Sequence, residues 1–300
     1  MVNKKTWGGT WTEQKLNAFE KYVKAYLTIM YSTREKHNGW PKNLIYFDGF
    51  AGSGIRSNDD KLDNLPKLEG IDITIDEENL YQGSCERVLG LEKKFDQHIL
   101  VDLNQNALNE LKNHLESKNI PIHNCHFVCQ DVNDYIVGFI NHLTKDDAAL
   151  MLLDPFGMQV KWNTIQKLIN KRIDLWLLLP SGVIVNRLID KKGDLKNIKL
   201  IEDFLGMNET EIREKFYKKE IQPTLFGETE YIQKIPEAIS KIASLYVEKL
   251  KEIFKYVTEK PLELKNSKNV TIFHFIFASN NKAAQKIAGQ IIDSSKRNSK

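Results

Sequence analysis

The chain has 300 residues, 41% of them apolar, which suffices for the core of one large α/β domain and does not require a second complete domain. Its net charge of +3 at pH 7 permits a nucleic-acid partner (DNA or RNA) without demanding one. The apolar runs are too short to span a bilayer and the Lys-rich start lacks a signal-peptide stretch, so we expect no membrane association and a cytoplasmic location.

An amphipathic helix is expected close to the amino terminus. The segment from Thr10 to Glu13 has the pattern of a capping box, and apolar residues follow it at helical spacing. We assign residues 1–38 to an N-terminal helical segment that packs on a central sheet or on an insertion.

The next segment, residues 45–54, is an apolar strand that ends in Asp-x-Phe-x-Gly-x-Gly. Glycines let a backbone approach a ligand closely, and the carboxylate before them can hold a positive charge. The loop lacks the patterns of nicotinamide and nucleoside-triphosphate sites. It therefore favours S-adenosyl-L-methionine, a positively charged nucleoside without phosphates, over an ordinary glycine turn. The cofactor-binding residues expected here are Asp48, Gly49, Phe50, Ala51, Gly52 and Gly54.

An acidic inserted loop follows over residues 58–82, with eight acidic and two basic side chains. Such a loop repels phosphates. It is a lid over the cofactor, a partner contact or a solvated surface excursion, and the solvated loop is favoured. Ser84 is then expected to cap a helix from Cys85 to Phe95.

Two further apolar runs end in carboxylates. The run from His98 to Asp102 predicts a strand, with Asp102 as the acceptor for ribose hydroxyls. The following strand leads to Asp131, which is expected to accept a hydrogen bond from the adenine amino group. Leu103 and Val132, which follow these carboxylates, are expected to line the same cofactor site.

A fourth apolar run, residues 148–153, ends in Asp154-Pro155-Phe156-Gly157. One acidic residue at a strand end is weak evidence because Asp is common in turns, but four in succession at one sheet edge indicate a binding site. A simpler alternative for the fourth motif is an Asp-Pro turn into the next helix.

The loop and its trailing acidic residues resemble class I S-adenosylmethionine-dependent methyltransferases. Asp-Pro-Phe-Gly is similar to the (D/N)-P-P-(Y/F) motif of those that methylate amino groups of nucleic-acid bases. A closer resemblance, from the first helix to nearly the end, is to the three-Cys-motif partner protein family. It is carried by residues 46–54 (YFDGFAGSG), 83–84 (GS), 153–160 (LDPFGMQV) and 277–280 (FASN). The resemblance implies a methyltransferase-like fold and a partner protein that carries the three cysteines.

The fourth motif suits transfer to an amine. An exocyclic amine is a poor nucleophile, so the enzyme must accept its protons, here through the Asp154 carboxylate and the Pro155 carbonyl. An aromatic ring then stacks on the flipped base. Phe156 replaces the second proline and Gly157 stands at the aromatic position, so either Phe156 takes the stacking role or no planar base binds there. The expected catalytic residues are Asp154, Pro155 and Phe156.

The three cysteines, Cys85, Cys125 and Cys129, are too few for a disulfide framework and fit a reducing compartment. Two of them lie in a predicted strand near His123 and His126, but strand alternation turns His126 to the opposite face. We therefore expect core cysteines and no metal.

The remaining chain predicts a short helix over residues 164–172, a fifth strand over 174–180, and a helical cap over 186–260 inserted between strands 5 and 6. The lysines of the cap form either a substrate surface or a solvated helix face. A hairpin over residues 262–278 and a closing helix over 282–292 complete the chain.

Together these patterns predict an α/β, Rossmann-like class I methyltransferase fold over residues 1–300. Its sheet is mostly parallel, with a C-terminal antiparallel hairpin and a helical insertion. The predicted function is S-adenosylmethionine-dependent methyl transfer to an amino group of a nucleic-acid base. The alternative is a catalytically silent subunit that acts through a three-cysteine-motif partner protein. A nuclease is disfavoured, because we find no P-D…(D/E)-x-K cluster.

Overall fold

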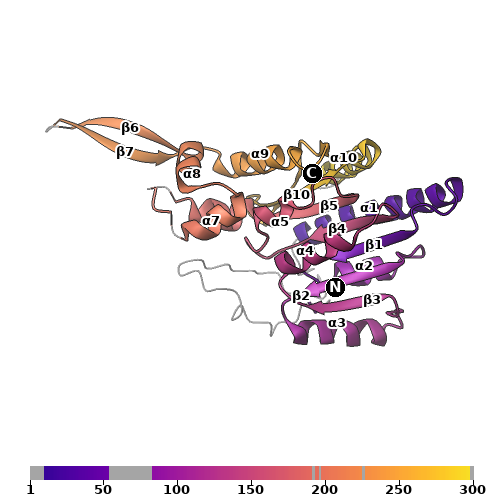
Figure 1. The fold of residues 1–300 in the computed structure, drawn as a ribbon. Coiled ribbons are helices and arrows are strands. Elements are labelled where there is room, and N and C mark those ends of the chain that lie inside the picture. The colour runs from indigo at the N-terminus through magenta and orange to yellow at the C-terminus, as the bar shows by residue number, and fades with distance from the viewer. Residues whose placement is uncertain (1–9, 54–82, 191–192, 196, 225–226, 298–300) are drawn as a thin grey trace, which may run out of the picture.

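The structure, a computed structural model, describes residues 10–53, 83–190, 193–195, 197–224 and 227–297. At its centre is an eight-stranded sheet of order β3-β2-β1-β4-β5-β10-β8, with β9 also paired to β10 (Figure 1). The strands are β1 (Asn43–Asp48), β2 (Gln97–Asp102), β3 (Cys125–Cys129), β4 (Asp147–Leu153), β5 (Ile173–Leu179), β8 (Tyr256–Val257), β9 (Leu262–Lys265) and β10 (Thr271–Ser279).

The first five strands are parallel, whereas β10 runs antiparallel to β5. Both β8 and β9 pair antiparallel with β10. Parallel strands covered on both faces are apolar at nearly every position, and β4 and β5 are buried along their whole length. This arrangement confirms the expected Rossmann-like class I methyltransferase fold, including the antiparallel C-terminal hairpin.

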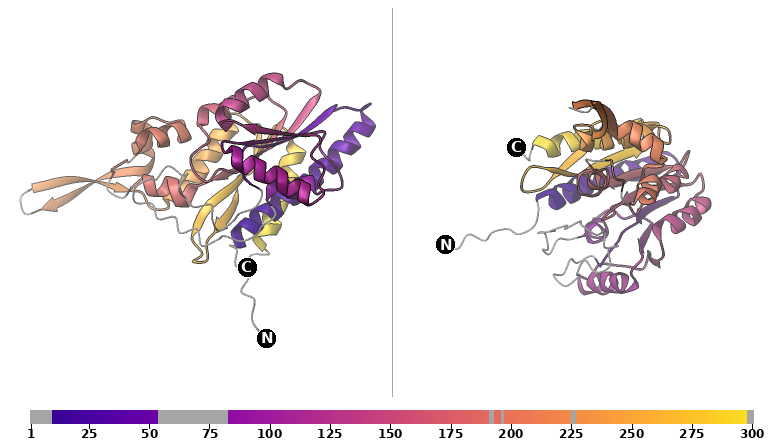
Figure 2. Two further views of the ribbon diagram at one scale, coloured as in Figure 1. Left: turned by 90° about the horizontal axis from the view of Figure 1, so that it is seen from below. Right: turned by 90° about the vertical axis from the view of Figure 1, so that its left-hand side faces the viewer.

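Helices cover both faces of the sheet (Figures 1 and 2). Because strand side chains alternate, the core divides in two. Tyr46 and Leu150 pack with α1, α2, α3 and α10, and Phe47 and Met151 with α4, α5, α7, α8 and α9. The helices are α1 (Thr10–Lys36), α2 (Ser84–Leu89), α3 (Gln105–Ser117), α4 (Val132–His142), α5 (Trp162–Gln166), the π-helical turn η2 (Ser181–Val185), α6 (Asn186–Leu188), α7 (Ile198–Leu205), α8 (Glu209–Phe216), α9 (Ala238–Lys251) and α10 (Lys282–Arg297).

The segment expected to be a helical cap contains a hairpin as well as helices. Strands β6 (Tyr217–Thr224) and β7 (Gly227–Lys234) pair with each other and project away from the rest of the molecule (Figures 1 and 2). Two other helices are shorter than expected: α2 ends at Leu89 rather than near Phe95, and α5 ends at Gln166. In the part of the chain that the structure describes, no helix combines the length and apolarity needed to cross a membrane.

A buried carboxylate ties α1 to the sheet. Asp174 of β5 accepts hydrogen bonds from the Tyr22 hydroxyl of α1 at 2.6 Å and from the Ser279 hydroxyl of β10 at 2.5 Å. Burial raises the pKa of Asp174 to about 6, although both hydrogen bonds act in the opposite direction. Three elements therefore meet at a carboxyl group whose charged form is costly to bury.

Stability should depend on pH through Asp174. The raised pKa means that the folded chain binds this proton more tightly than the unfolded chain, so the stabilisation is fully present below the unfolded pKa and is lost as the pH rises through about 6. Asp174→Asn should remove this dependence, which amounts to about 3 kcal/mol of unfolding free energy. Urea denaturation at about pH 4 and about pH 7 measures it.

The matched control is Asp134→Asn, which alters an exposed carboxylate on α4. It should leave the pH profile of the unfolding free energy unchanged. If wild type and Asp174→Asn showed parallel profiles, the assignment of a raised pKa to Asp174 would be wrong.

Candidate functional site

Four carboxylates lie at the carboxyl ends of adjacent strands. Asp48 is the last residue of β1 and pairs in register with Leu100 of β2 and Leu152 of β4. Asp102 ends β2, while Asp131 and Asp154 follow the ends of β3 and β4. Because these strands are parallel, all four carboxylates come to the same edge of the sheet, as the sequence predicted.

Asp48 is completely buried. One of its oxygens accepts hydrogen bonds from the hydroxyls of Tyr46 at 2.8 Å and Ser84 at 2.6 Å, and the other accepts from the backbone NH of Phe50 at 3.2 Å. Burial raises the pKa of Asp48, the hydrogen bonds from Ser84 and Tyr46 lower it, and the nearby charge of Asp154 raises it. The carboxylate therefore organises the glycine loop from beneath.

Ser84 has a different role from the helix cap expected of it. The N-cap residue of α2 is Gly83, without a side-chain capping bond. The Ser84 hydroxyl instead binds Asp48 across the gap between α2 and β1. The first residue of α2 thus holds the carboxylate under the loop.

The glycine loop lies across the ends of β1 and β2. The backbone NH of Ala51 donates to the carbonyl of Val101 at 3.0 Å, and that of Gly52 donates to the Asp102 carboxylate at 2.9 Å. Gly52 has φ +58°, a conformation that favours glycine, and a Cβ there would meet nothing within 4 Å. A side chain at Gly49 would lie 2.6 Å from the Leu153 side chain. The loop is therefore closely packed at its start and open at Gly52.

The two middle carboxylates are partly exposed and anchor local backbone. Asp102 also accepts a hydrogen bond from the backbone NH of Asn104 at 2.8 Å, which turns the chain into α3. Asp131 caps α4 by accepting from the backbone NH of Asn133 at 2.8 Å. Leu103 is 72% exposed beside Asp102, whereas Val132 is buried.

Asp154 is paired with a lysine from α1, which the sequence did not reveal. The Lys15 ammonium donates to Asp154 Oδ2 at 2.5 Å, and the side chains of Lys15 and Asp154 are 3% and 17% exposed. The Lys15 nitrogen also lies 5.6 Å from the centre of the Trp11 ring. Trp11 in turn stacks on Phe273, with ring centroids 5.0 Å apart. The amino end of α1 and the start of β10 thus form a wall beside the fourth strand tip.

The segment that follows the fourth motif is held by an asparagine. Pro155 is buried and Phe156 is 49% exposed. Asn133, which is 6% exposed, donates to the Gln159 carbonyl at 2.9 Å and accepts from the Lys161 backbone NH at 2.9 Å. The chain is therefore held at Asp154 and again at Gln159 and Lys161, with the Phe156 ring at the surface between them.

A buried Ser–His pair lies near the same edge. The Ser181 hydroxyl and His274 Nδ1 are 2.6 Å apart, and their exposures are 0% and 5%. Burial lowers the pKa of His274 to about 4, so the imidazole is neutral at physiological pH. Because solvent does not reach Ser181, the pair is a packing contact between β10 and η2 rather than a nucleophile.

The cysteines differ in part from the expectation, and two other predicted features lie outside the described residues. Cys85 is buried as expected, but Cys125 is half-buried and Cys129 is exposed at the edge strand, so the prediction of core cysteines is wrong for Cys129. Among the described residues, no three His, Cys, Asp or Glu side chains gather as metal ligands. Gly54 and the acidic loop over 58–82 lie outside the described residues.

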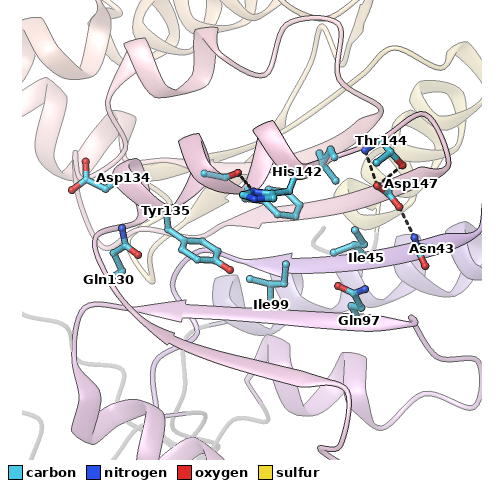
Figure 3. Close-up of a pocket in the computed structure, with 13 residues that line it drawn as sticks. Asn43, Ile45, Gln97, Ile99, Gln130, Asp134, Tyr135, His142, Thr144 and Asp147 are labelled. Carbon is cyan, nitrogen blue, oxygen red and sulfur yellow. Dashed lines mark hydrogen bonds between the residues drawn. The ribbon is translucent and has the colours of Figure 1, made fainter.

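A groove of about 620 Å³ runs between α4 and the sheet, and one end of it reaches Gln130, next to Asp131 (Figure 3). Its wall includes Ile45, Ile99 and Tyr135, and it reaches Asn43 and Gln97 at the amino ends of β1 and β2. Gly138 of α4 leaves space there, because a Cβ would meet nothing within 4 Å. The groove thus runs along α4 from the strand tips toward the amino ends of the strands.

No protein-family model matches the chain, and no curated protein matches it either. The solved structure of protein LPL1258 from Legionella pneumophila, of the family model DUF519, is similar at 18% identity, with a TM-score of 0.39 and coverage of 90% of this chain and 96% of that one. An rRNA methylase from Streptococcus thermophilus shares 14% identity (TM-score 0.28; 65% and 89% covered). A precorrin 8w decarboxylase from Methanobacterium thermoautotrophicum shares 8% (TM-score 0.27; 64% and 77% covered). Likeness at this level does not decide what the chain binds or does, and the fold assignment rests on the strand order.

Alanine should have opposite effects on stability at Gly49, at the start of the loop, and at Gly138, in α4. Gly49→Ala should destabilise the fold by about 1–3 kcal/mol, since the new methyl group would crowd Leu153 and Val132, which are both buried. Gly138→Ala should stabilise it by about 0.5–1 kcal/mol, because the helix gains propensity and the space is open. Thermal melts of both variants measure this, and a harmless Gly49→Ala would contradict the packing.

Proposed function

We propose that this chain is an S-adenosylmethionine-dependent methyltransferase that acts on an amino group of a nucleic-acid base. The observation that carries the proposal is the convergence of Asp48, Asp102, Asp131 and Asp154 with the glycine loop at one sheet edge. Acidic strand tips around an exposed glycine backbone suit a ligand with a positive charge, ribose hydroxyls and an amino group.

The residues present fit this cofactor. Gly52 exposes its backbone at the loop, and Asp102 is partly exposed where a ribose would need an acceptor. Asp131 is also partly exposed and is the candidate acceptor for the adenine amino group, with Leu103 beside the same edge. When bound, S-adenosylmethionine supplies an electrophilic methyl group on a sulfonium.

The fourth tip is assigned to the methyl acceptor. Asp154 accepts a hydrogen bond from an ammonium group in this structure, so its carboxylate can hold a nitrogen donor. Together with the Pro155 carbonyl it would accept hydrogen bonds from the N–H groups of an exocyclic amine and so direct the nitrogen lone pair outward. Phe156, half-exposed beside them, is the candidate ring for stacking on a base.

A second candidate is a catalytically silent, cofactor-binding subunit that acts through a three-cysteine-motif partner. The observation that favours it is the contact between Lys15 and Asp154, because the oxygen that would accept the substrate amine already has a donor. On this alternative the chain alone transfers no methyl group to any nucleic acid.

Substitutions should separate cofactor binding from transfer. Asp154→Asn should lower methyl transfer to nucleic acid at least about 100-fold and leave cofactor affinity within about twofold, because the residue serves the acceptor. Asp102→Ala should weaken binding about tenfold or more by removing a charged acceptor. Calorimetry with S-adenosylmethionine gives the affinities, and labelled methyl incorporation into total RNA and DNA gives transfer.

The exposed Asp134 of α4 provides the control, since Asp134→Asn should change neither quantity. Undiminished transfer by Asp154→Asn would discard its assignment. Cofactor binding without label in RNA or DNA, unless the three-cysteine partner is added, would support the silent subunit instead.

A further inference from the structure

The acceptor position proposed above is already next to an amine of the chain itself. Lys15 Nζ lies 2.5 Å from Asp154 Oδ2, although the two residues are 139 positions apart. This is the contact that an acceptor amine must make with the carboxylate before its lone pair can attack a methyl group. The amine that the structure places at Asp154 belongs to α1.

The burial of this pair argues against a purely stabilising role. Removing an ammonium and a carboxylate from water is costly, and their attraction often fails to offset that cost. The Lys15 side chain is only 3% exposed, so nearly all of this desolvation cost applies to it. Charged pairs retained at such a cost beside a ligand site are candidates for function.

A second observation concerns the aromatic wall. The Lys15 nitrogen lies 5.6 Å from the centre of the Trp11 ring, and Trp11 stacks on Phe273. A tryptophan face attracts both ammonium and methylated ammonium groups, because methylation retains the positive charge. The ring beside Lys15 can therefore face the cationic side chain before and after methylation.

We propose that Lys15 Nζ is a self-methylation site and that Asp154 is its general base. The proposal rests on the proposed function, since the methyl donor is the S-adenosylmethionine assigned to the strand tips. It extends that function to an acceptor within the chain.

The step balances without a further reactant. Asp154 takes one proton from the Lys15 ammonium, and a sulfonium bound at the strand tips would favour this loss. The freed nitrogen lone pair forms the new N–C bond as the S–C bond breaks, and the bonding electrons remain on sulfur. S-adenosylhomocysteine and a methylated, still cationic lysine result, and Asp154, at 17% exposure, returns its proton to water.

The test needs no external substrate. The purified full-length chain is incubated with S-adenosylmethionine carrying a labelled methyl group, and proteolytic peptides are analysed by mass spectrometry. Label should appear on the peptide that contains Lys15, approaching one methyl group per chain. Methyl groups that are already present on Lys15 before the incubation would also support the proposal. Because the acceptor is buried within the same chain, the rate should not change with protein concentration.

Three variants make the test specific. Lys15→Arg keeps the charge but cannot be deprotonated, and it should abolish the label. Asp154→Asn should lower the rate at least about 100-fold. Lys21→Arg, which changes an exposed lysine on the same helix, should be labelled like wild type. Thermal melts establish that each variant is folded.

Calorimetry on the same samples separates the two proposals. If the chain binds S-adenosylmethionine and no methyl group is found on Lys15, self-methylation is overturned while the cofactor site stands, and Lys15 is then a counter-charge for Asp154. If S-adenosylmethionine does not bind and Lys15 is unmodified, both proposals fail. Label on other lysines only would also overturn the assignment to Lys15.

Discussion

The parallel pairing of β1 with β2 on one side and with β4 on the other brings the candidate site together. It places the loop after β1 between the ends of its neighbours, where Gly52 reaches Asp102 and Gly49 packs on Leu153. Asp48 fixes this geometry from below through donors on β1, the loop and α2. The glycine backbone is thus presented by a rigid, buried support, as a binding loop requires.

The N-terminal helix belongs to both the core and the site. Its apolar side packs on one face of the sheet, and its Tyr22 binds the buried Asp174. One end of the same helix carries Trp11 and Lys15 to the fourth strand tip. Any movement of α1 that separates Lys15 from Asp154 must therefore disturb contacts with β5 and β10. The contact between Lys15 and Asp154 therefore depends on the packing of the whole α1 helix and not on the loop alone.

The strands and their acidic ends were predictable because buried parallel strands leave continuous apolar runs, such as Ala148 to Leu153, that stop abruptly at a polar residue. The β6–β7 hairpin was not predictable, because its polar and charged sequence lacks the alternation of apolar residues that indicates a strand and resembles an exposed helix. The pairing of Lys15 with Asp154 also left no local signal, since it joins segments 139 residues apart. Burial of Asp48 and exposure of Cys129 depend on which elements cover a strand end or a sheet edge, and sequence periodicity does not report that.

The central claim is that the four strand tips hold S-adenosylmethionine, and diffraction from crystals grown with S-adenosylhomocysteine tests it most directly. Density for the ligand is expected over the loop from Gly49 to Ser53, with the ribose hydroxyls at Asp102 and the adenine beside Asp131. Density for the ligand in the groove along α4 or at another surface, with the strand tips empty, would show that the strand tips are not the cofactor site.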